Sequence, residues 1–270
     1  MAERDYLLGT HDAELERLGL QHRLWRARVL EAWRRARLGP GQTVLDVGAG
    51  PGYAALDLAE IVGRSGRVVA LERSRRFLDA LVARAAARGL AQLEVRETDV
   101  VSGEFGVAGA DAAWCRWLLC FVSDPRAVLA RIRAALRPGG VAVFHEYLDY
   151  RAWALSPPCP PHERFVGQVI ASWRAEGGEP DVGRSLLGQL IEAGFRIEGT
   201  RLHVEFIAPD DPFWAWPVAY VEVGSARFVE LGLMSAPEAH ELIAAVRAAE
   251  ARPETRMLTP PVLEVIARVP

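Results

Sequence analysis

Two amino acids are missing from this chain of 270 residues, which contains no lysine and no asparagine. Without lysine there is no Schiff-base chemistry, no Walker-type phosphate-binding lysine and no protein-kinase lysine. Without asparagine there is no N-glycosylation and no catalytic asparagine. Alanine, arginine, glycine and leucine are abundant instead, a bias typical of a GC-rich bacterial genome.

Cysteine and long apolar runs are also scarce. The three cysteines, Cys115, Cys120 and Cys159, form neither a disulfide framework nor a metal-ligand spacing with the six histidines. No apolar run reaches the roughly 20 residues that a membrane helix needs, and the charged start has no apolar segment behind it. We therefore expect a cytoplasmic protein with no membrane association and no metal site.

The charge balance disfavours a nucleic-acid partner. Thirty-two basic residues face 35 acidic ones, for a net charge of −3, whereas nucleic-acid binders usually carry a basic excess. The arginines between positions 23 and 37 alternate with apolar residues, so they are expected to form the solvated face of a helix. The length allows one substantial core with a smaller cap, and it leaves the oligomeric state open, a homodimer included.

The most informative stretch lies at residues 44–52 and reads Val-Leu-Asp-Val-Gly-Ala-Gly-Pro-Gly. It is an apolar run that enters a glycine-rich turn and then a helix-like segment, and a second apolar run ends at Glu72. This is the pattern of a nucleotide-binding βαβ unit, in which the glycines let the backbone approach a ligand and the acid binds ribose hydroxyls. A dinucleotide fingerprint would need glycine at position 53, where the chain has Tyr53.

Strand-like and helix-like segments alternate after residue 40, which predicts a parallel sheet with helices on both faces. A helix is expected over 5–38 because apolar residues recur there at three- and four-residue spacing. Expected strands are 43–47, 67–71, 93–96, 110–115, 141–146, 195–206 and 262–269; expected helices are 53–61, 74–88, 124–136, 182–193 and 237–251. Two long connections, at about 147–180 and 208–258, are predicted cap insertions. Their aromatic residues could fill a core or line a pocket for a small molecule.

These motifs and their order resemble the class I S-adenosylmethionine (SAM) methyltransferases, most closely the bacterial small-molecule enzymes with an N-terminal helical lid. The resemblance implies an α/β fold with a Rossmann-like, doubly wound sheet of seven mostly parallel strands, the last antiparallel. It implies a lid over 1–39 and a SAM-binding domain over 40–270 that carries the cap insertions. The expected cofactor is SAM, and the product is S-adenosylhomocysteine.

The same resemblance implies a set of cofactor-binding residues. Asp46, Gly48, Ala49, Gly50 and Gly52 would pack against the methionine moiety. Glu72, followed by Arg73, would hold the ribose, and Asp99 and Val100 the adenine. Cys115 and Arg116 would lie under the sulfonium, while Tyr6 and Gln21 of the lid would face the cofactor. Many relatives have a histidine just after the fourth strand, but here the run is Phe-Val-Ser-Asp-Pro at 121–125, so a base is missing at that place.

His145 lies at the carboxyl end of the fifth expected strand, with Tyr147 and Tyr150 close behind. These three residues are the predicted catalytic groups, which would orient or deprotonate the acceptor. The alternative is a structural histidine hydrogen-bonded to Glu146. Methyl transfer also needs chiefly an in-line approach, so positioning alone could suffice.

The sequence thus predicts a methyltransferase that acts on an O, N or C nucleophile of a small, partly apolar molecule, in bacterial secondary metabolism. Two alternatives stay open: a SAM-binding protein of the same fold with a non-methylating role, and an RNA or protein methyltransferase.

Overall fold

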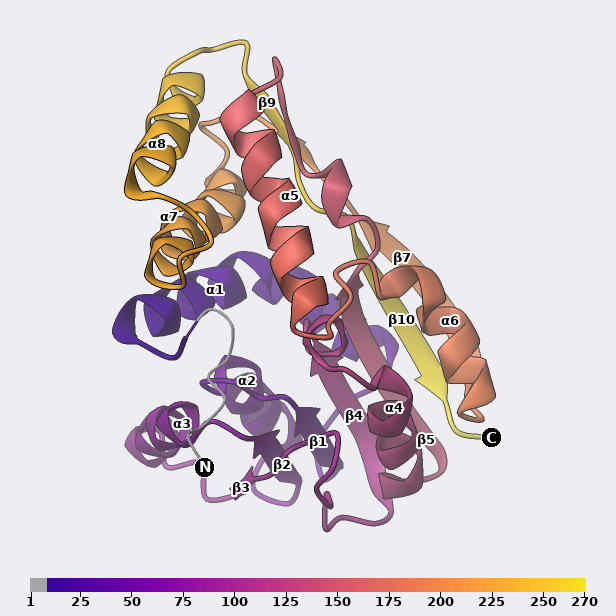
Figure 1. Cartoon of the computed structure of the whole chain (residues 1–270). Helices are drawn as coiled ribbons and strands as arrows, with labels where there is room; N and C mark the ends of the chain where they lie inside the picture. The colour runs from indigo at the N-terminus through magenta and orange to yellow at the C-terminus, as the bar shows by residue number, and fades with distance from the viewer. Residues whose placement is uncertain (1–8) are drawn as a thin grey trace.

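The computed structural model describes residues 9–270, and a seven-stranded sheet forms its centre (Figure 1). The strand order is β3–β2–β1–β4–β5–β10–β7. The strands are β1 (Thr43–Val47), β2 (Arg67–Glu72), β3 (Leu93–Glu97), β4 (Ala110–Arg116), β5 (Leu136–Tyr147), β7 (Arg196–His203) and β10 (Val262–Arg268). β1 to β5 pair in parallel, and β10 runs antiparallel to both β5 and β7. The expected sheet with an antiparallel last strand is confirmed.

The strand order reverses between β1 and β4, and this reversal places the helices on both faces. Right-handed crossovers going outward from β1 and outward from β4 must put their helices on opposite sides. α2 (Tyr53–Val62) and α3 (Arg75–Ala87) contact each other, while α4 (Pro125–Ala135) contacts α6 (Gly183–Glu192). A crevice opens at such a reversal, outside the carboxyl ends of the strands.

The N-terminal helix, α1 (Asp12–Arg35), is shorter than expected within the described residues. It begins at Asp12 because the Glu14 backbone N–H donates to His11 Nδ1 at 3.2 Å, which caps the first turn. It ends before Arg37, whose φ of +61° leaves the helical region. The expected apolar stripe is buried from His22 onward. α1 packs on α2 and on α7 (Ala215–Glu230).

The two predicted insertions fold together as one cap. The first contains β6 (Ala154–Ser156) and α5 (Pro160–Ala175), with short 3₁₀ turns at Leu119–Phe121 and Tyr150–Ala152 nearby. The second contains a 3₁₀ turn (Pro212–Trp214), α7 (Ala215–Glu230), α8 (Ala236–Glu250) and β9 (Arg256–Leu258). α5, α7 and α8 contact one another in series above α1 (Figure 1).

A second, three-stranded sheet was not expected from the sequence. Its order is β6–β9–β8, and β8 is Phe206–Ile207. The strand expected over 195–206 was therefore wrong in its second part, because the chain leaves the large sheet after His203. There Glu205 exchanges hydrogen bonds with Thr259: its N–H donates to Thr259 Oγ1 at 3.0 Å, and its carbonyl accepts from the Thr259 N–H at 2.9 Å. α7 was also missed, since it is apolar around most of its circumference.

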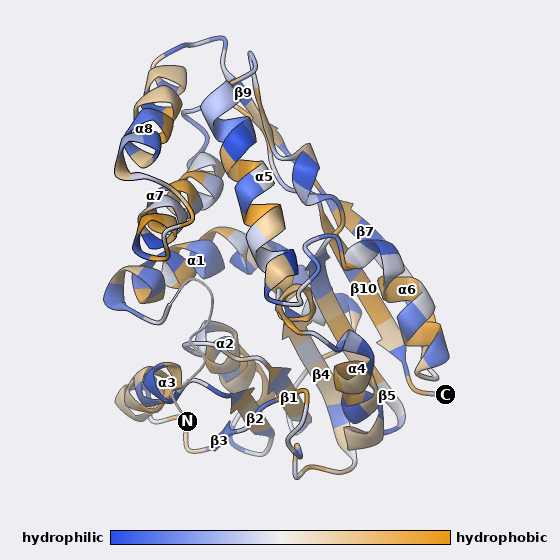
Figure 2. Cartoon of the chain, viewed as in Figure 1, coloured by the Kyte–Doolittle hydropathy of each residue, from blue (hydrophilic) through white to orange (hydrophobic). Residues whose placement is uncertain are grey.

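The central strands of the large sheet are mostly hydrophobic, whereas its edge strands β3 and β7 and the outer faces of the helices carry hydrophilic residues (Figure 2). β1, β2, β4 and β5 are almost wholly buried, as expected of parallel strands covered on both sides. Among residues 9–270, no helix combines the length and the apolar character needed to cross a membrane.

One cap residue makes a testable contribution to acid stability. His162 in α5 is fully buried, neither of its ring nitrogens has a hydrogen-bond partner among residues 9–270, and its ring packs edge-on to Trp153, with 4.6 Å between the ring centroids. Burial lowers the pKa of His162 to about 4. Between about pH 6.5 and pH 4 the unfolded chain therefore binds a proton that the folded chain does not, so stability is lost as the pH falls.

We expect His162→Leu to remove this loss. The drop in the free energy of unfolding between pH 8 and pH 5, measured by denaturant titration, should be smaller than in the parent by about 2 kcal/mol. The exposed His240→Leu is the control for loss of a histidine. An equal drop in the parent and in His162→Leu would contradict the assignment.

Candidate functional site

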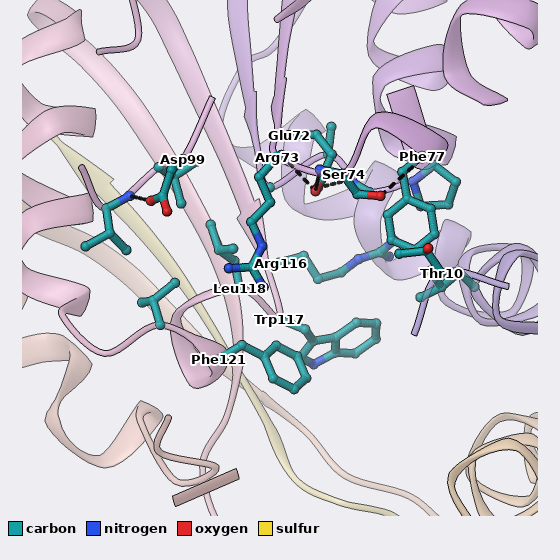
Figure 3. Close-up of a pocket in the computed structure, with 18 of the residues that line it drawn as sticks. Thr10, Glu72, Arg73, Ser74, Phe77, Asp99, Arg116, Trp117, Leu118 and Phe121 are labelled. Carbon is teal, nitrogen blue, oxygen red and sulfur yellow. Dashed lines mark hydrogen bonds between the residues drawn. The ribbon is translucent and has the colours of Figure 1, made fainter. Parts of the chain in front are cut away.

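A cavity of about 910 Å³ lies at the carboxyl ends of β1, β2, β3 and β4 and extends to α1, α5 and α7 (Figure 3). This volume is near the upper end for small-molecule sites, so it can hold more than one small molecule. Its polar wall contains Asp46, Gly48, Ala49, Gly50, Glu72, Arg73, Ser74, Thr98, Asp99, Val100 and Arg116. Its more apolar wall contains Leu18, Trp117, Leu118, Phe121, Val122, Trp173, Leu231 and Leu233.

The glycine-rich turn after β1 supplies backbone to the cavity. Gly48 has φ +73°, and a Cβ there would lie 2.8 Å from Leu118 Cδ1. The turn is fastened to the neighbouring strand because the Gly48 and Ala49 N–H groups donate to the Leu71 carbonyl, at 2.9 and 3.0 Å. Glycine is therefore required at 48 for conformation and for space, as expected of a backbone that approaches a ligand.

Gly52 departs from the expectation, since it does not line the cavity. It has φ +81°, and a Cβ there would lie 2.1 Å from Leu81 Cδ1, so its role is to let α2 pack on α3. We expect Gly52→Ala to lower the free energy of unfolding by about 1–3 kcal/mol, because the new methyl overpacks the core. Gly89→Ala, at the αL position that follows α3, has φ +64° and open space, so it keeps the backbone strain but lacks the clash. If thermal unfolding shows the same loss of stability in both variants, the packing role of Gly52 is contradicted.

Glu72 ends β2, and backbone amides fix its carboxylate. One oxygen accepts from the Gly50 N–H at 2.9 Å, and the other accepts from Arg73 and Ser74, each at 2.9 Å. Burial raises the pKa of Glu72, and these amides oppose the rise. The carboxylate is thus held in one orientation at the cavity wall (Figure 3), where it can accept hydrogen bonds from a diol.

Asp46 is the most buried acid on this wall, at 2% exposure. Burial raises its pKa to about 7, and its Oδ2 atom has no hydrogen-bond partner among the described residues. An unsatisfied buried carboxylate is costly unless a cation or donor reaches it. The residue therefore fits the positively charged end of a ligand in the cavity.

Asp99 lies in the loop after β3 and orders that loop. Its Oδ1 accepts from the Val101 N–H at 2.8 Å and from the Ser102 N–H at 3.2 Å. Asp99 and the buried Val100 both line the cavity. The aspartate thus forms the turn that aspartates favour and also faces the cavity; its contact with adenine stays a prediction.

Arg116 at the end of β4 is held from behind by α1. Its Nη2 lies 3.2 Å from His22 Nδ1, and His22 Nε2 lies 3.1 Å from Asp57 Oδ2. Because a carboxylate only accepts, His22 carries its proton on Nε2 and accepts from Arg116 on Nδ1. Burial lowers the pKa of Arg116 to about 10, so the guanidinium remains charged at neutral pH. No sequence motif indicated His22, which lies in the apolar stripe of an ordinary amphipathic helix.

The remaining expected cofactor residues divide into three groups. Gln21, Ala49 and Arg73 line the cavity. Gln21 is fixed there because its Oε1 accepts from Trp216 Nε1 and Arg17 Nη1, both at 3.1 Å. Cys115 does not line it, since the side chain is fully buried within the sheet. Tyr6 lies outside the described residues.

His145 requires a correction. It is absent from the cavity lining and fully buried, and its Nε2 donates to Glu264 Oε2 at 3.0 Å. The alternative partner, Glu146, was wrong as well, because adjacent strand residues point to opposite faces. Burial lowers the pKa of His145 well below its usual range. The side chain is thus a core group and not a base that can reach a ligand.

Glu264 has several hydrogen-bond and ion-pair partners beneath α1. His203 Nε2 also donates to its Oε2, at 2.9 Å, and Arg35 forms an ion pair with its other oxygen. Two histidines and a carboxylate this close could hold a metal ion. Arg35 already neutralises Glu264, however, so the cluster is a charge-balanced link between α1, β5, β7 and β10.

The two expected catalytic tyrosines also lie outside the cavity lining. Tyr147 and Tyr150 are 7% and 2% exposed, and burial raises the pKa of both well above the usual range. Tyr147 stacks on Trp117, at 5.6 Å between ring centroids. Tyr147 therefore supports a cavity residue from behind and does not contact a ligand directly.

Several cavity residues were not singled out by the sequence. Of the cap aromatics, Trp173 lines the cavity, whereas Trp153, Phe213, Trp214, Trp216 and Tyr220 do not. Phe121, Val122 and Ser123, the run that stands where relatives have a histidine, also line it. Phe77, Arg227, Leu231 and Leu233 come from segments without a motif, and only the tertiary fold brings them there.

Comparison with known proteins agrees with this site. A family model described as a methyltransferase domain matches residues 44–140. The nocamycin O-methyltransferase of Saccharothrix syringae is 34% identical over 121 residues, 44% of this chain and 43% of the relative. The 2-phytyl-1,4-naphtoquinone methyltransferase of Synechococcus elongatus is 36% identical over 126 residues, 46% of this chain and 52% of the relative. The chain thus spans about half the length of these curated relatives.

Among solved structures, geranyl diphosphate methyltransferase in complex with GPP and sinefungin is 18% identical, with a TM-score of 0.55. The alignment covers 92% of this chain and 78% of that chain, so the likeness of fold extends beyond the matched domain. The glycine-rich turn, the fixed Glu72 and the unsatisfied Asp46 fit SAM as cofactor. Residues 44–140 thus match the methyltransferase domain family, and the chain as a whole is similar to SAM-dependent methyltransferases in sequence and in fold.

Proposed function

We propose that this protein transfers a methyl group from SAM to an O, N or C nucleophile of a small, partly apolar molecule. One observation carries the proposal: a single cavity joins the polar ends of β1–β4 to an aromatic and aliphatic wall from the cap. A donor on the first wall and an acceptor on the second would lie in one enclosed space, which is what methyl transfer by proximity needs.

On the donor side, SAM supplies a methyl group on a positively charged sulfur. Asp46 would face the positive charge, Glu72 would accept from the ribose hydroxyls, and Asp99 with Val100 would receive the adenine. Gly48, Ala49 and Gly50 would provide close backbone contact, and Arg73 and Gln21 would close the ends of the site. These roles are supported by the burial of Asp46 and the amide-fixed carboxylate of Glu72.

On the acceptor side, the chemistry of the wall supports a small molecule. Leu18, Trp117 and Phe121 face the same space as Trp173, Leu231 and Leu233. We infer that residues 1–39 act as a lid and that the segments 147–180 and 208–258 act as a cap over the acceptor. The relatives named for a naphtoquinone and for nocamycin support an acceptor of this size, and a role in bacterial secondary metabolism is part of the proposal.

Formation of S-adenosylhomocysteine from SAM, followed by mass spectrometry with a panel of phenols, quinols and amines, tests the proposal. We expect product with at least one small acceptor, together with the matching methylated compound. SAM binding without turnover on any acceptor would favour the non-methylating alternative. Retention on heparin at moderate salt, with methylation of RNA or protein, would favour a macromolecular substrate.

A further inference from the structure

Two polar groups in the cavity wall, next to each other in the chain, are left without partners. Arg116 Nη1 and Trp117 Nε1 are both buried, and neither has a hydrogen-bond acceptor among the described residues. Both residues line the cavity and lie beside each other in Figure 3. Buried donors are almost always satisfied in folded proteins, so a pair of unsatisfied donors on a cavity wall points to an acceptor atom on a ligand.

The position of Trp117 is imposed by its surroundings. Its φ of +48° is in the left-handed region, which is rare for a bulky residue and is typical of functional sites. Its N–H donates to the His145 carbonyl at 2.9 Å, and its ring stacks on Tyr147 and on Trp216, at 5.6 and 5.7 Å between centroids. Because the ring stacks on both partners, the indole of Trp117 is held in one orientation at the cavity wall.

Arg116 is fixed by independent contacts. His22 accepts from Nη2 and is itself held by Asp57, so the guanidinium cannot rotate freely and Nη1 keeps its direction. The guanidinium carbon lies 5.0 Å from the centroid of the Trp117 ring. A positive charge and a neutral N–H donor are therefore preorganised side by side, which is the arrangement that stabilises a negatively charged oxygen.

The cavity offers few groups that could remove a proton from the acceptor. Among the described residues that line it there is no histidine. The hydroxyl of Tyr53 is occupied, because it donates to the Leu15 carbonyl and accepts from Arg84 Nη2, each at 3.0 Å. Four carboxylates also line the cavity: Asp46, Glu72 and Asp99 are assigned to the cofactor in the proposed function, and Glu176 is exposed. An acceptor that arrives already deprotonated needs no such base.

We propose that Arg116 and Trp117 bind the anionic oxygen of the methyl acceptor, and that the acceptor is an acidic hydroxyl compound, a phenol or enol, bound as its anion. This inference rests on the proposed function. The acceptor loses its proton to water on binding. The anion's electron pair then forms the bond to the methyl carbon, at the oxygen or at a conjugated carbon. The carbon–sulfur bond breaks, and its electron pair stays on sulfur as the neutral thioether product.

The test uses 4-nitrophenol, whose anion has its own visible absorbance band, and its neutral methyl ether, 4-nitroanisole. Both are titrated into the intact chain saturated with S-adenosylhomocysteine, about one pH unit below the pKa of the phenol in solution. We expect the bound probe to be the phenolate, with its apparent pKa lowered by about one unit or more. Arg116→Gln and Trp117→Phe should each weaken phenolate binding about 10-fold or more, because each removes a hydrogen bond to a charged atom. Binding of 4-nitroanisole should change less than about 2-fold, by the same reasoning.

Arg116→Lys should retain part of the phenolate affinity, because lysine keeps the positive charge but lacks the rigid, planar set of donors of a guanidinium. Arg23→Gln, an exposed arginine of the lid helix, removes the same net charge and should match the parent. Binding of the probe as neutral phenol, equal affinity for both probes in the parent, or failure of both to bind would overturn the inference. If Arg116→Gln does not fold, the inference is still tested by phenolate binding to Trp117→Phe and by the ionisation state of the probe bound to the parent.

Calorimetry with S-adenosylhomocysteine separates this inference from the proposed function. If the parent does not bind S-adenosylhomocysteine, the proposed function fails. If the parent binds it and Arg116→Gln loses that affinity while phenolate binding is unaffected, Arg116 belongs to the cofactor, and the oxyanion pair is refuted while the proposed function stands.

Discussion

Replacing Glu264 with alanine is expected to lower the free energy of unfolding by about 3–5 kcal/mol. Glu264 is 1% exposed and joins Arg35 of α1 to His145 and His203 of the sheet. Without the carboxylate, a partly buried guanidinium, the buried His145 imidazole and the partly buried His203 imidazole lose their shared partner, which is far more costly than loss of a surface ion pair. Denaturant titration at pH 7.5 measures the change.

Glu264→Gln and Glu241→Ala provide the matched controls. Glutamine keeps an acceptor for the histidines but leaves Arg35 without a counter-charge, so an intermediate loss is expected. Glu241 forms an exposed pair with Arg164, and its removal should change stability by less than about 1 kcal/mol. If a chelator lowers the thermal midpoint of the parent but not of Glu264→Ala, the cluster holds a metal ion and the structural assignment is wrong.

The second large effect concerns the cofactor. Glu72→Gln is expected to weaken binding of S-adenosylhomocysteine about 10- to 100-fold, because hydrogen bonds to a carboxylate contribute about 1.5–3 kcal/mol. The carboxylate is already oriented by the Gly50, Arg73 and Ser74 amides, so it offers its remaining lone pairs without reorganisation. Isothermal calorimetry on the folded variant gives the affinity.

Glu97→Gln is the control for this experiment. Glu97 pairs in register with Glu72 at the end of the neighbouring strand, is exposed and does not line the cavity. The Glu97→Gln variant should bind S-adenosylhomocysteine with the affinity of the parent. If both variants bind equally well, Glu72 is a surface acid and the ribose contact lies elsewhere.

The donor side of the site could be predicted from the sequence because local rules determine it. A glycine-rich turn after one strand and an acid at the end of the next occupy fixed places in a βαβ unit. The structure brings Asp46, Gly48, Glu72 and Asp99 to one cavity, as the motif spacing required. Gly52 and Cys115 belong to the same motifs, yet they face the core, because motif spacing does not determine on which side of a turn or strand a residue lies.

The acceptor side could not be predicted in the same way. His145 occupies the right end of β5, but a one-residue difference in strand phase decides whether a side chain faces the cavity or the interior. Trp117 follows β4, Trp173 lies in α5 and Arg227 lies in α7, up to about 110 residues apart, so only the tertiary fold places them on one cavity. The partner of His145, Glu264, lies 119 residues away, and no local pattern connects them.

Calorimetric titration of the intact chain with S-adenosylhomocysteine and, separately, with NAD tests the central claim most directly. Tyr53 stands where a dinucleotide-binding turn would need its third glycine, and the cavity ends in a fixed acid and an unsatisfied aspartate. We therefore expect S-adenosylhomocysteine to bind with a measurable heat and NAD to bind more weakly or not at all. Tighter binding of NAD than of S-adenosylhomocysteine would contradict the account.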